Sequence, residues 1–162
     1  MKYFAGIDPG ASGSMAVLDD NGKFVGCVRF AKATDKEIFE FMSEVSMNGS
    51  LFCVKEKVWA MPSTDGEGRK MGASTSFTFG ENNGFIRGLL VGCQIAYEEF
   101  TPQTWQKSFS MKKDKGEAQS DYKRRLKQKA EELFPSIKIT NDMADSILIA
   151  EYCRRKHSTN LL

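Results

Sequence analysis

Short apolar runs separated by turn residues fill the first part of the chain. Residues 2–7 form such a run, which ends at Asp8 before a Pro-Gly pair, and similar runs follow at 15–18 and 23–30. Asn21-Gly22 separates the last two runs and is typical of a tight hairpin turn. This pattern predicts two successive hairpins, and therefore an antiparallel meander at the start of the fold.

The rest of the chain adds one strand pattern and then mostly helical periodicity. Residues 51–56 alternate so that Phe52, Val54 and Glu56 share one strand face. Helices are predicted over 71–91, 120–134 and 142–152, with a short helical segment starting at Pro102. Residues 91–100 have strand-like composition. The pattern as a whole indicates an α/β fold in one domain over 1–162.

Four acidic side chains stand where this pattern brings carboxylates together. Asp8 lies at a strand end, and Glu56 is in line with core residues of another strand. Asp142 and Asp145 are three apart at the start of a helix and therefore share one helix face. Oxygen ligands of this kind favour Mg²⁺ or Mn²⁺, which commonly hold phosphates. The spacing predicts a divalent-metal site.

Each acid also has a simpler interpretation. Asp8 can form an Asx turn before Pro-Gly, and Asp142 can compensate the dipole at a helix N-terminus. Glu56 is harder to explain in this way, because a carboxylate near a core needs a cation, while Lys55 and Lys57 point to the opposite strand face. A metal is the simpler partner for Glu56.

Composition narrows the class of protein. With 162 residues and 41% hydrophobic content, the chain suits one soluble domain, and no membrane-spanning or targeting segment is visible. Only one histidine is present, and the four cysteines are far apart, which disfavours both a zinc site and a disulfide framework. We therefore expect buried thiols in a reducing compartment, the cytoplasm.

Positive charge is concentrated in one segment. Residues 112–129 carry eight Lys or Arg against three Asp or Glu, although the formal net charge of the whole chain is only +2. Apolar residues at helical spacing within 120–134 leave most of these cations on exposed sides, and 112–116 is expected to be a mobile basic loop. The segment is either an ordinary solvated helix face or a surface for a polyanion. Because the same chain also carries a predicted acidic metal site, we favour the interpretation that this segment binds a polyanion.

The middle of the chain is less decisive. Residues 61–68 are rich in turn formers and are expected to form a loop over the site. Gly80, Gly84 and Gly88 recur every four residues within the helix predicted over 71–91. Because glycine weakens a helix, this spacing indicates close packing, either against the protein's own sheet or against a partner helix.

These segments together resemble the RuvC-like Holliday junction resolvases, especially the short bacteriophage type. The resemblance spans nearly the whole chain in the family's order. It rests on the following segments: Gly6-Ile7-Asp8-Pro9-Gly10 with Gly13; Glu56-Lys57-Val58-Trp59; Phe77-Thr78-Phe79-Gly80; Gly84-Phe85-Ile86-Arg87-Gly88-Leu89-Leu90; Pro102-Gln103-Thr104-Trp105; Ala130-Glu131-Glu132-Leu133-Phe134-Pro135; and Asp142-Met143-Ala144-Asp145-Ser146-Ile147-Leu148-Ile149-Ala150.

The resemblance implies an RNase H-like fold, with a five-stranded mixed sheet whose first three strands are antiparallel and whose two faces carry helices. It also implies a homodimer that presents two active sites to a four-way DNA junction. The protein would then resolve Holliday junctions and other branched DNA by paired nicks during recombination or repair, without a membrane partner. A phage-encoded enzyme would act in the host-cell cytoplasm.

The family's four catalytic carboxylates match Asp8, Glu56, Asp142 and Asp145. The implied chemistry is hydrolysis with two Mg²⁺ ions per site, or Mn²⁺ in their place, which leaves 5′-phosphate and 3′-hydroxyl ends. Lys123 matches a basic residue near the scissile phosphate, and Trp59 matches an aromatic residue that stacks on junction bases. The expected DNA contacts are Trp59, Lys113, Lys115, Lys123, Arg124 and Lys127.

Some features depart from the family or admit other functions. Residues 111–121 are longer than the usual loop, and Tyr122 replaces the usual acidic neighbour of Lys123. The Asp8-Pro9-Gly10 turn also resembles the phosphate loop of actin-like ATPases, but those proteins need two such lobes. A catalytically silent junction-binding module and a ribonuclease that cuts RNA/DNA hybrids remain the alternatives.

Overall fold

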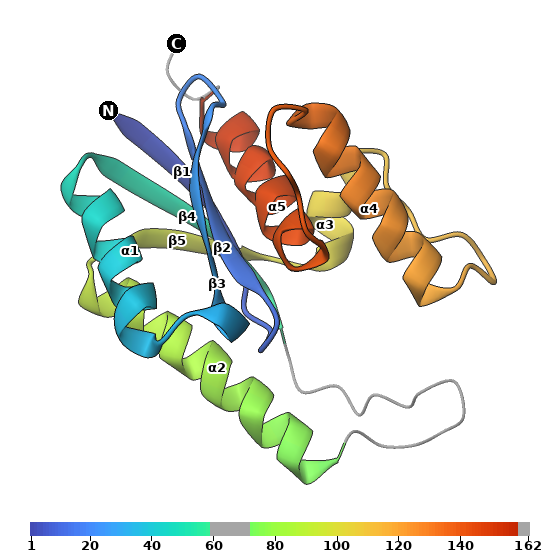
Figure 1. The fold of residues 1–162 in the computed structure, drawn as a ribbon, viewed down its shortest axis with the longest axis horizontal. Helices are drawn as coiled ribbons and strands as arrows, with labels where there is room; N and C mark the ends of the chain where they lie inside the picture. The colour runs from blue at the N-terminus through green and yellow to red at the C-terminus, as the bar shows by residue number, and fades with distance from the viewer. Residues whose placement is uncertain (59–71, 159–162) are drawn as a thin grey trace.

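The computed structural model describes residues 1–58 and 72–158 and is built around one five-stranded mixed sheet (Figure 1). Its strands run in the order β3-β2-β1-β4-β5, and the first three are antiparallel while β4 and β5 are parallel to β1. The strands are β1 (Lys2–Asp8), β2 (Ser14–Asp19), β3 (Phe24–Arg29), β4 (Ser50–Glu56) and β5 (Ala96–Phe100). The predicted α/β class and sheet are confirmed.

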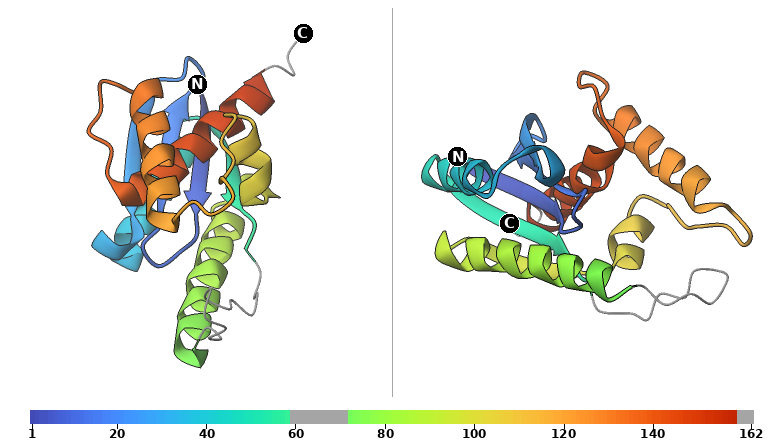
Figure 2. Two further views of the ribbon diagram at one scale, coloured as in Figure 1. Left: turned by 90° about the vertical axis from the view of Figure 1, so that its right-hand side faces the viewer. Right: turned by 60° about the horizontal axis from the view of Figure 1, so that its bottom comes forward.

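Helices cover both faces of this sheet (Figures 1 and 2). One core cluster joins the sheet to α1 (Asp35–Met47) and α2 (Ala73–Gly92). The other joins the opposite face to α3 (Pro102–Lys107), α4 (Gln119–Leu133) and α5 (Asn141–Ser158). A short 3-10 turn, Phe30–Lys32, follows β3. None of the described helices is both long and apolar enough to cross a bilayer.

Two stretches differ from the sequence predictions. The sequence pattern does not predict α1. A capping box between Thr34 and Glu37 starts this helix. Its buried residues, Ile38, Met42 and Val45, face the core. The strand expected over 91–100 begins only at Ala96, because α2 continues through Gly92. Gln94, with a φ of 54°, then turns the chain in a left-handed conformation before the strand.

Gly6, in the middle of β1, allows α5 to lie directly against the sheet. A Cβ atom at this position would stand 2.1 Å from the backbone nitrogen of Ala150 and 2.2 Å from the carbonyl oxygen of Ser146. No side chain fits in that space, so glycine is required for the close approach of helix and strand. The contact carries the N-terminal part of α5, including Asp145, toward the end of β1.

We therefore expect Gly6→Ala to destabilise the protein, because the added methyl group collides with helix backbone that cannot move aside cheaply. The free energy of unfolding should fall by on the order of 3 kcal/mol or more in chemical denaturation. Gly92→Ala is the matched control, since a Cβ there meets open space. That variant should lose nothing, and an equal loss in both would contradict the close-approach argument.

Candidate active site

Three of the predicted acids gather at one edge of the sheet. β1 and β4 are parallel neighbours whose register pairs Ile7 with Lys55, so Asp8 and Glu56 stand side by side at the carboxyl ends of their strands. Asp145, which is 7% exposed, approaches them from α5. Burial raises the pKa of Asp8 and of Glu56, and the negative charge of Asp145 raises both further.

Asp8 also serves the turn that follows β1. One of its carboxylate oxygens accepts a hydrogen bond of 3.1 Å from the Gly10 backbone N–H, as an Asx turn requires. Burial raises the pKa of Asp8, and the negative charge of Asp145 raises it further. The hydrogen bond from Gly10 and the positive charge of Lys123 lower it, but the net shift is upward. Asp8 therefore does form the Asx turn that its simpler interpretation predicts. This turn uses one carboxylate oxygen and leaves the second oxygen for other contacts.

Glu56 has a partner that sequence reasoning did not foresee. The buried Trp105 on α3 donates its indole N–H to Glu56 Oε2 at 2.9 Å. Burial, then the nearby Asp8, raise the pKa of Glu56 to about 7, although the Trp105 hydrogen bond lowers it. The neighbouring Lys55 is fully buried on the opposite face, where it pairs with Glu99 at 2.7 Å and donates to Asn83. The predicted orientation of Lys55 is correct.

Asp145 is held by Lys123, which reaches across from α4. The two side chains form a hydrogen-bonded ion pair through Asp145 Oδ2, while Asp145 Oδ1 is buried without a hydrogen-bond partner among residues 1–58 and 72–158. Partial burial lowers the pKa of Lys123, but Asp145, Asp8 and Glu56 outweigh this effect and the pKa is raised. Lys123 therefore stays protonated beside the three acids.

Asp142 points to a different neighbour. Its carboxylate lies 3.7 Å from Arg29 of β3 and accepts a hydrogen bond from Thr140, in the first turn of α5. The Ser14 hydroxyl donates to the Asp142 backbone carbonyl at 2.6 Å. The structure thus brings three of the four predicted acids together and turns the fourth toward Arg29, a residue that the sequence pattern did not single out.

The chemistry of the acid cluster fits a divalent cation. Among the described residues, no three acidic, histidine or cysteine side chains are arranged closely enough to hold one ion as they stand. The site nevertheless contains three carboxylates, and the charges of its acids contribute to the raised pKa of Asp8 and of Glu56. One carboxylate oxygen, Oδ1 of Asp145, is also buried with no hydrogen-bond partner in the described part of the chain. A hard cation with oxygen ligands would relieve both the repulsion and the unsatisfied oxygen.

Basic side chains line a groove next to these acids. A cavity of about 510 Å³ between α4 and α5 is bordered by Asp145 and by Lys123, Arg124 and Lys127, three of the predicted DNA contacts. Lys113 and Lys115 lie in the exposed connection before α4, where Lys113 donates to Gln119 at 3.0 Å. Trp59 and the predicted loop over 61–68 fall outside the described residues.

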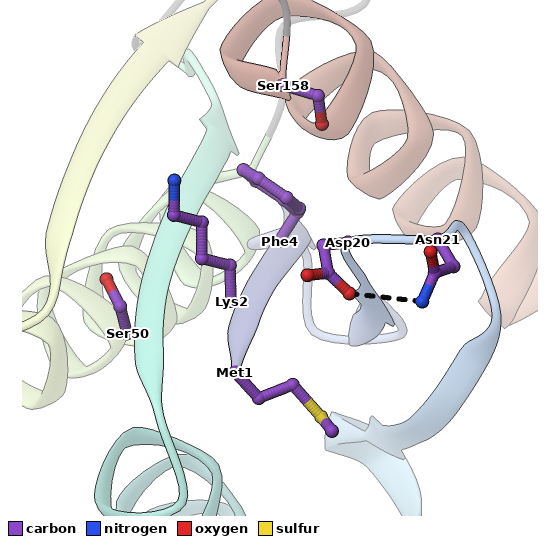
Figure 3. A pocket seen from close by; sticks show the side chains of 7 residues that line it. All are labelled: Met1, Lys2, Phe4, Asp20, Asn21, Ser50 and Ser158. Atoms are coloured by element: carbon purple, nitrogen blue, oxygen red, sulfur yellow. Dashed lines mark hydrogen bonds between the residues drawn. The ribbon is translucent and has the colours of Figure 1, made fainter. Parts of the chain in front are cut away.

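A second cavity, of about 720 Å³, lies at the opposite end of the sheet (Figure 3). Lys2 and Ser50, which open β1 and β4, lie in its wall, while the acid cluster lies at the other ends of these strands. Asp20, the one carboxylate among the described residues that line it, accepts a hydrogen bond of 3.3 Å from Asn21. This cavity does not share the chemistry of the acid cluster.

The order and directions of the five strands, with helices on both faces of the sheet, define an RNase H-like α/β fold. No protein-family model matches the chain, and no curated protein matches it significantly in sequence. Solved structures do resemble it. RuvC from T. thermophilus in complex with a Holliday junction substrate superposes with a TM-score of 0.60, 12% identity and 98% coverage of both chains. Another structure of Thermus thermophilus RuvC superposes with a TM-score of 0.56 and 15% sequence identity, covering 96% of this chain and 97% of that chain.

The partly buried carboxyl of Glu56 should make the free energy of unfolding depend on pH in EDTA. Its pKa rises from 4.5 to about 7 on folding. Between these values the folded state binds more protons, so the free energy of unfolding falls as the pH rises. Glu56→Gln has no carboxyl to ionise at this position and should not lose stability in this way. The free energy of unfolding of this variant, relative to that of wild type, should therefore rise by on the order of 2 kcal/mol between about pH 4.5 and pH 8.

Denaturant titrations across this range measure the effect. Glu40→Gln, on the exposed surface of α1, is the matched control for the loss of one carboxylate. A difference between Glu56→Gln and wild type that stays constant with pH would contradict the proposed burial of Glu56.

Proposed function

We propose that this protein is a structure-specific DNA endonuclease that cuts Holliday junctions and other branched DNA by paired nicks, with Mg²⁺ as its cofactor. The observation that carries the proposal is the meeting of Asp8, Glu56 and Asp145 from three separate elements, next to the cations of α4. The fold shared with RuvC, which has been solved with a Holliday junction, supports branched DNA as the substrate. We expect Mn²⁺ to support cleavage in place of Mg²⁺.

The proposed ligands of the metal are Asp8, Glu56, Asp145 and, after it leaves Arg29, Asp142. Two bound ions would supply activation of the attacking water and stabilisation of the leaving 3′-oxygen. Trp105 fixes the orientation of the Glu56 carboxylate through its indole N–H. Lys123, released from Asp145 as a cation takes its place there, would offset the negative charge that develops on the phosphate.

DNA binding is assigned to the basic groove and its surroundings. Lys123, Arg124 and Lys127 border the groove beside Asp145, so a strand held by its phosphates there would pass the carboxylates. Lys113 and Lys115 extend the positive surface toward the exposed connection before α4, and Trp59 is proposed to stack on unpaired bases. Phosphate contacts of this kind release counterions, so affinity should fall steeply as salt rises.

Substrate choice separates this proposal from its alternatives. A cleavage panel should compare a four-way junction, a three-way junction, a flap, a linear duplex and an RNA/DNA hybrid in Mg²⁺. We expect the junction to be cut fastest, with symmetric paired nicks. Preferred cleavage of the hybrid would instead identify a ribonuclease, and tight junction binding without cleavage would identify a catalytically silent module.

Asp8→Asn and Asp145→Asn should each remove detectable junction cleavage while leaving junction binding in EDTA largely intact, because each removes one negative ligand and keeps the side chain's shape. Gel assays of cleavage and fluorescence anisotropy of binding measure the two effects. Asp20→Asn, on the β2–β3 hairpin at the opposite end of the sheet, is the matched control and should cut normally. Undiminished cleavage by either site variant would refute the assignment of the metal ligands.

Paired nicks require two active sites, and we propose that α2 joins two copies of the chain. One line of positions on this helix consists of Phe77, Gly80, Gly84, Gly88 and Val91, here called the open face of α2. Phe77 and Val91 are 72% and 69% exposed, and a Cβ at any of the three glycines would meet nothing within 4 Å. The open face lies opposite the buried Ile86 and Leu90, so small residues there would let a second helix approach closely.

Gly84→Arg should convert the dimer to a monomer, because a long cation in the middle of the open face prevents close approach of two helices. Size-exclusion chromatography with light scattering measures the change. Thr78→Arg adds the same side chain at an exposed position on the flank of α2 and serves as the control. A wild-type protein that is monomeric, or a Gly84→Arg variant that remains dimeric, would exclude this interface.

A further inference from the structure

A polar cavity lies between α3, the connection over 108–118 and α4, apart from the acid cluster. The cavity, here called the α3–α4 pocket, has a volume of about 760 Å³, a size usual for small-molecule sites. Figure 2 shows the connection between α3 and α4 extending away from the sheet. Three glutamines and three lysines contribute to the wall of the pocket: Gln103, Gln106, Gln119, Lys107, Lys112 and Lys113.

The composition of this wall limits what can bind. Among the described residues no Asp or Glu lines the pocket, so the charge of its wall is positive and an anion is favoured. Phosphate alone, however, only accepts hydrogen bonds, whereas each glutamine amide offers both a donor and an acceptor. Met111 and Pro102 add apolar surface. An anionic group joined to a flat ring with donors and acceptors on its edge satisfies all three features, and a nucleotide is such a group.

A second observation concerns Tyr122, the α4 residue of this wall. Its side chain belongs to the core and its hydroxyl is buried without a hydrogen-bond partner among the described residues. Unsatisfied buried hydroxyls are uncommon in native proteins, and each costs free energy that a bound group or water can recover. One residue of the pocket wall therefore carries an unsatisfied polar atom, which a small shift of the wall around a bound group would allow to pair.

The two helices of the pocket are also those that support the acid cluster. α3 carries Trp105, which donates to Glu56, and α4 carries Lys123, which pairs with Asp145 directly after Tyr122. A DNA strand that reaches the carboxylates would therefore pass the two helices that also form the pocket. We propose that the α3–α4 pocket receives one unpaired nucleotide of the strand that is cut, with its base against the glutamine amides and its phosphate near the lysines. This inference rests on the proposed function.

The test places a single abasic residue at successive positions of a four-way junction and measures binding in EDTA by fluorescence anisotropy. For wild type, one position near the branch should weaken binding about five-fold, the value of one or two lost hydrogen bonds. In the double variant Gln103→Ala/Gln106→Ala, intact DNA should bind about five-fold more weakly, and the abasic residue at that position should have no further effect. Gln128→Ala, an exposed amide of α4 outside the pocket, should behave as wild type.

Three outcomes would overturn the proposal. The first is a profile without any sensitive position, and the second is a sensitive position that stays equally sensitive in the double variant. The third is that the double variant Lys107→Gln/Lys112→Gln binds intact and abasic DNA equally more weakly than wild type, while Gln103→Ala/Gln106→Ala binds normally. This result would indicate a phosphate site that does not contact a base. Because binding is measured without metal, these outcomes are distinct from a failure of cleavage, which would refute the nuclease assignment instead.

Discussion

The close contact between α5 and β1 at Gly6 is the constraint on which the site depends. The helix backbone at Ser146 and Ala150 occupies the space that any side chain on Gly6 would need. Asp145 precedes Ser146, and Asp8 lies two residues beyond Gly6 on the strand. The same contact that packs helix against sheet therefore sets the separation between the acid of the helix and the acids of the two strands.

Bringing carboxylates together has an electrostatic cost, and the surrounding residues offset part of it. Burial and mutual repulsion raise the pKa of Asp8 and Glu56, so both acids would ionise more readily in water. Lys123 supplies a positive charge from α4, and Trp105 supplies a neutral donor from α3. Neither fully satisfies the site, because Asp145 Oδ1 has no hydrogen-bond partner within the residues that the structure describes. A binding site in this condition gains stability from a cation.

The surfaces outside the acid cluster suit an enzyme that holds a large branched substrate. The open face of α2 lies on one side of the sheet, whereas the basic groove and the α3–α4 pocket lie on the other. Contact between two copies through α2 would therefore leave both grooves free for DNA. α3 and α4 both line the pocket and contact the acids, so a nucleotide in the proposed site would act on the acids through Trp105 and Lys123.

Local sequence determined the strands of the meander, the helices around Gly84 and Leu126, and the identity of the four acids, because periodicity and turn residues act over a few positions. The Thr34–Glu37 capping box is a local signal for α1 that the pattern of apolar runs did not bring out, and that pattern also did not place the end of α2 at Gly92. Tertiary structure alone decided which acids meet. Trp105 reaches Glu56 across 49 residues, and Arg29 rather than another acid faces Asp142, because sheet register and helix packing set such contacts and local pattern carries no record of them.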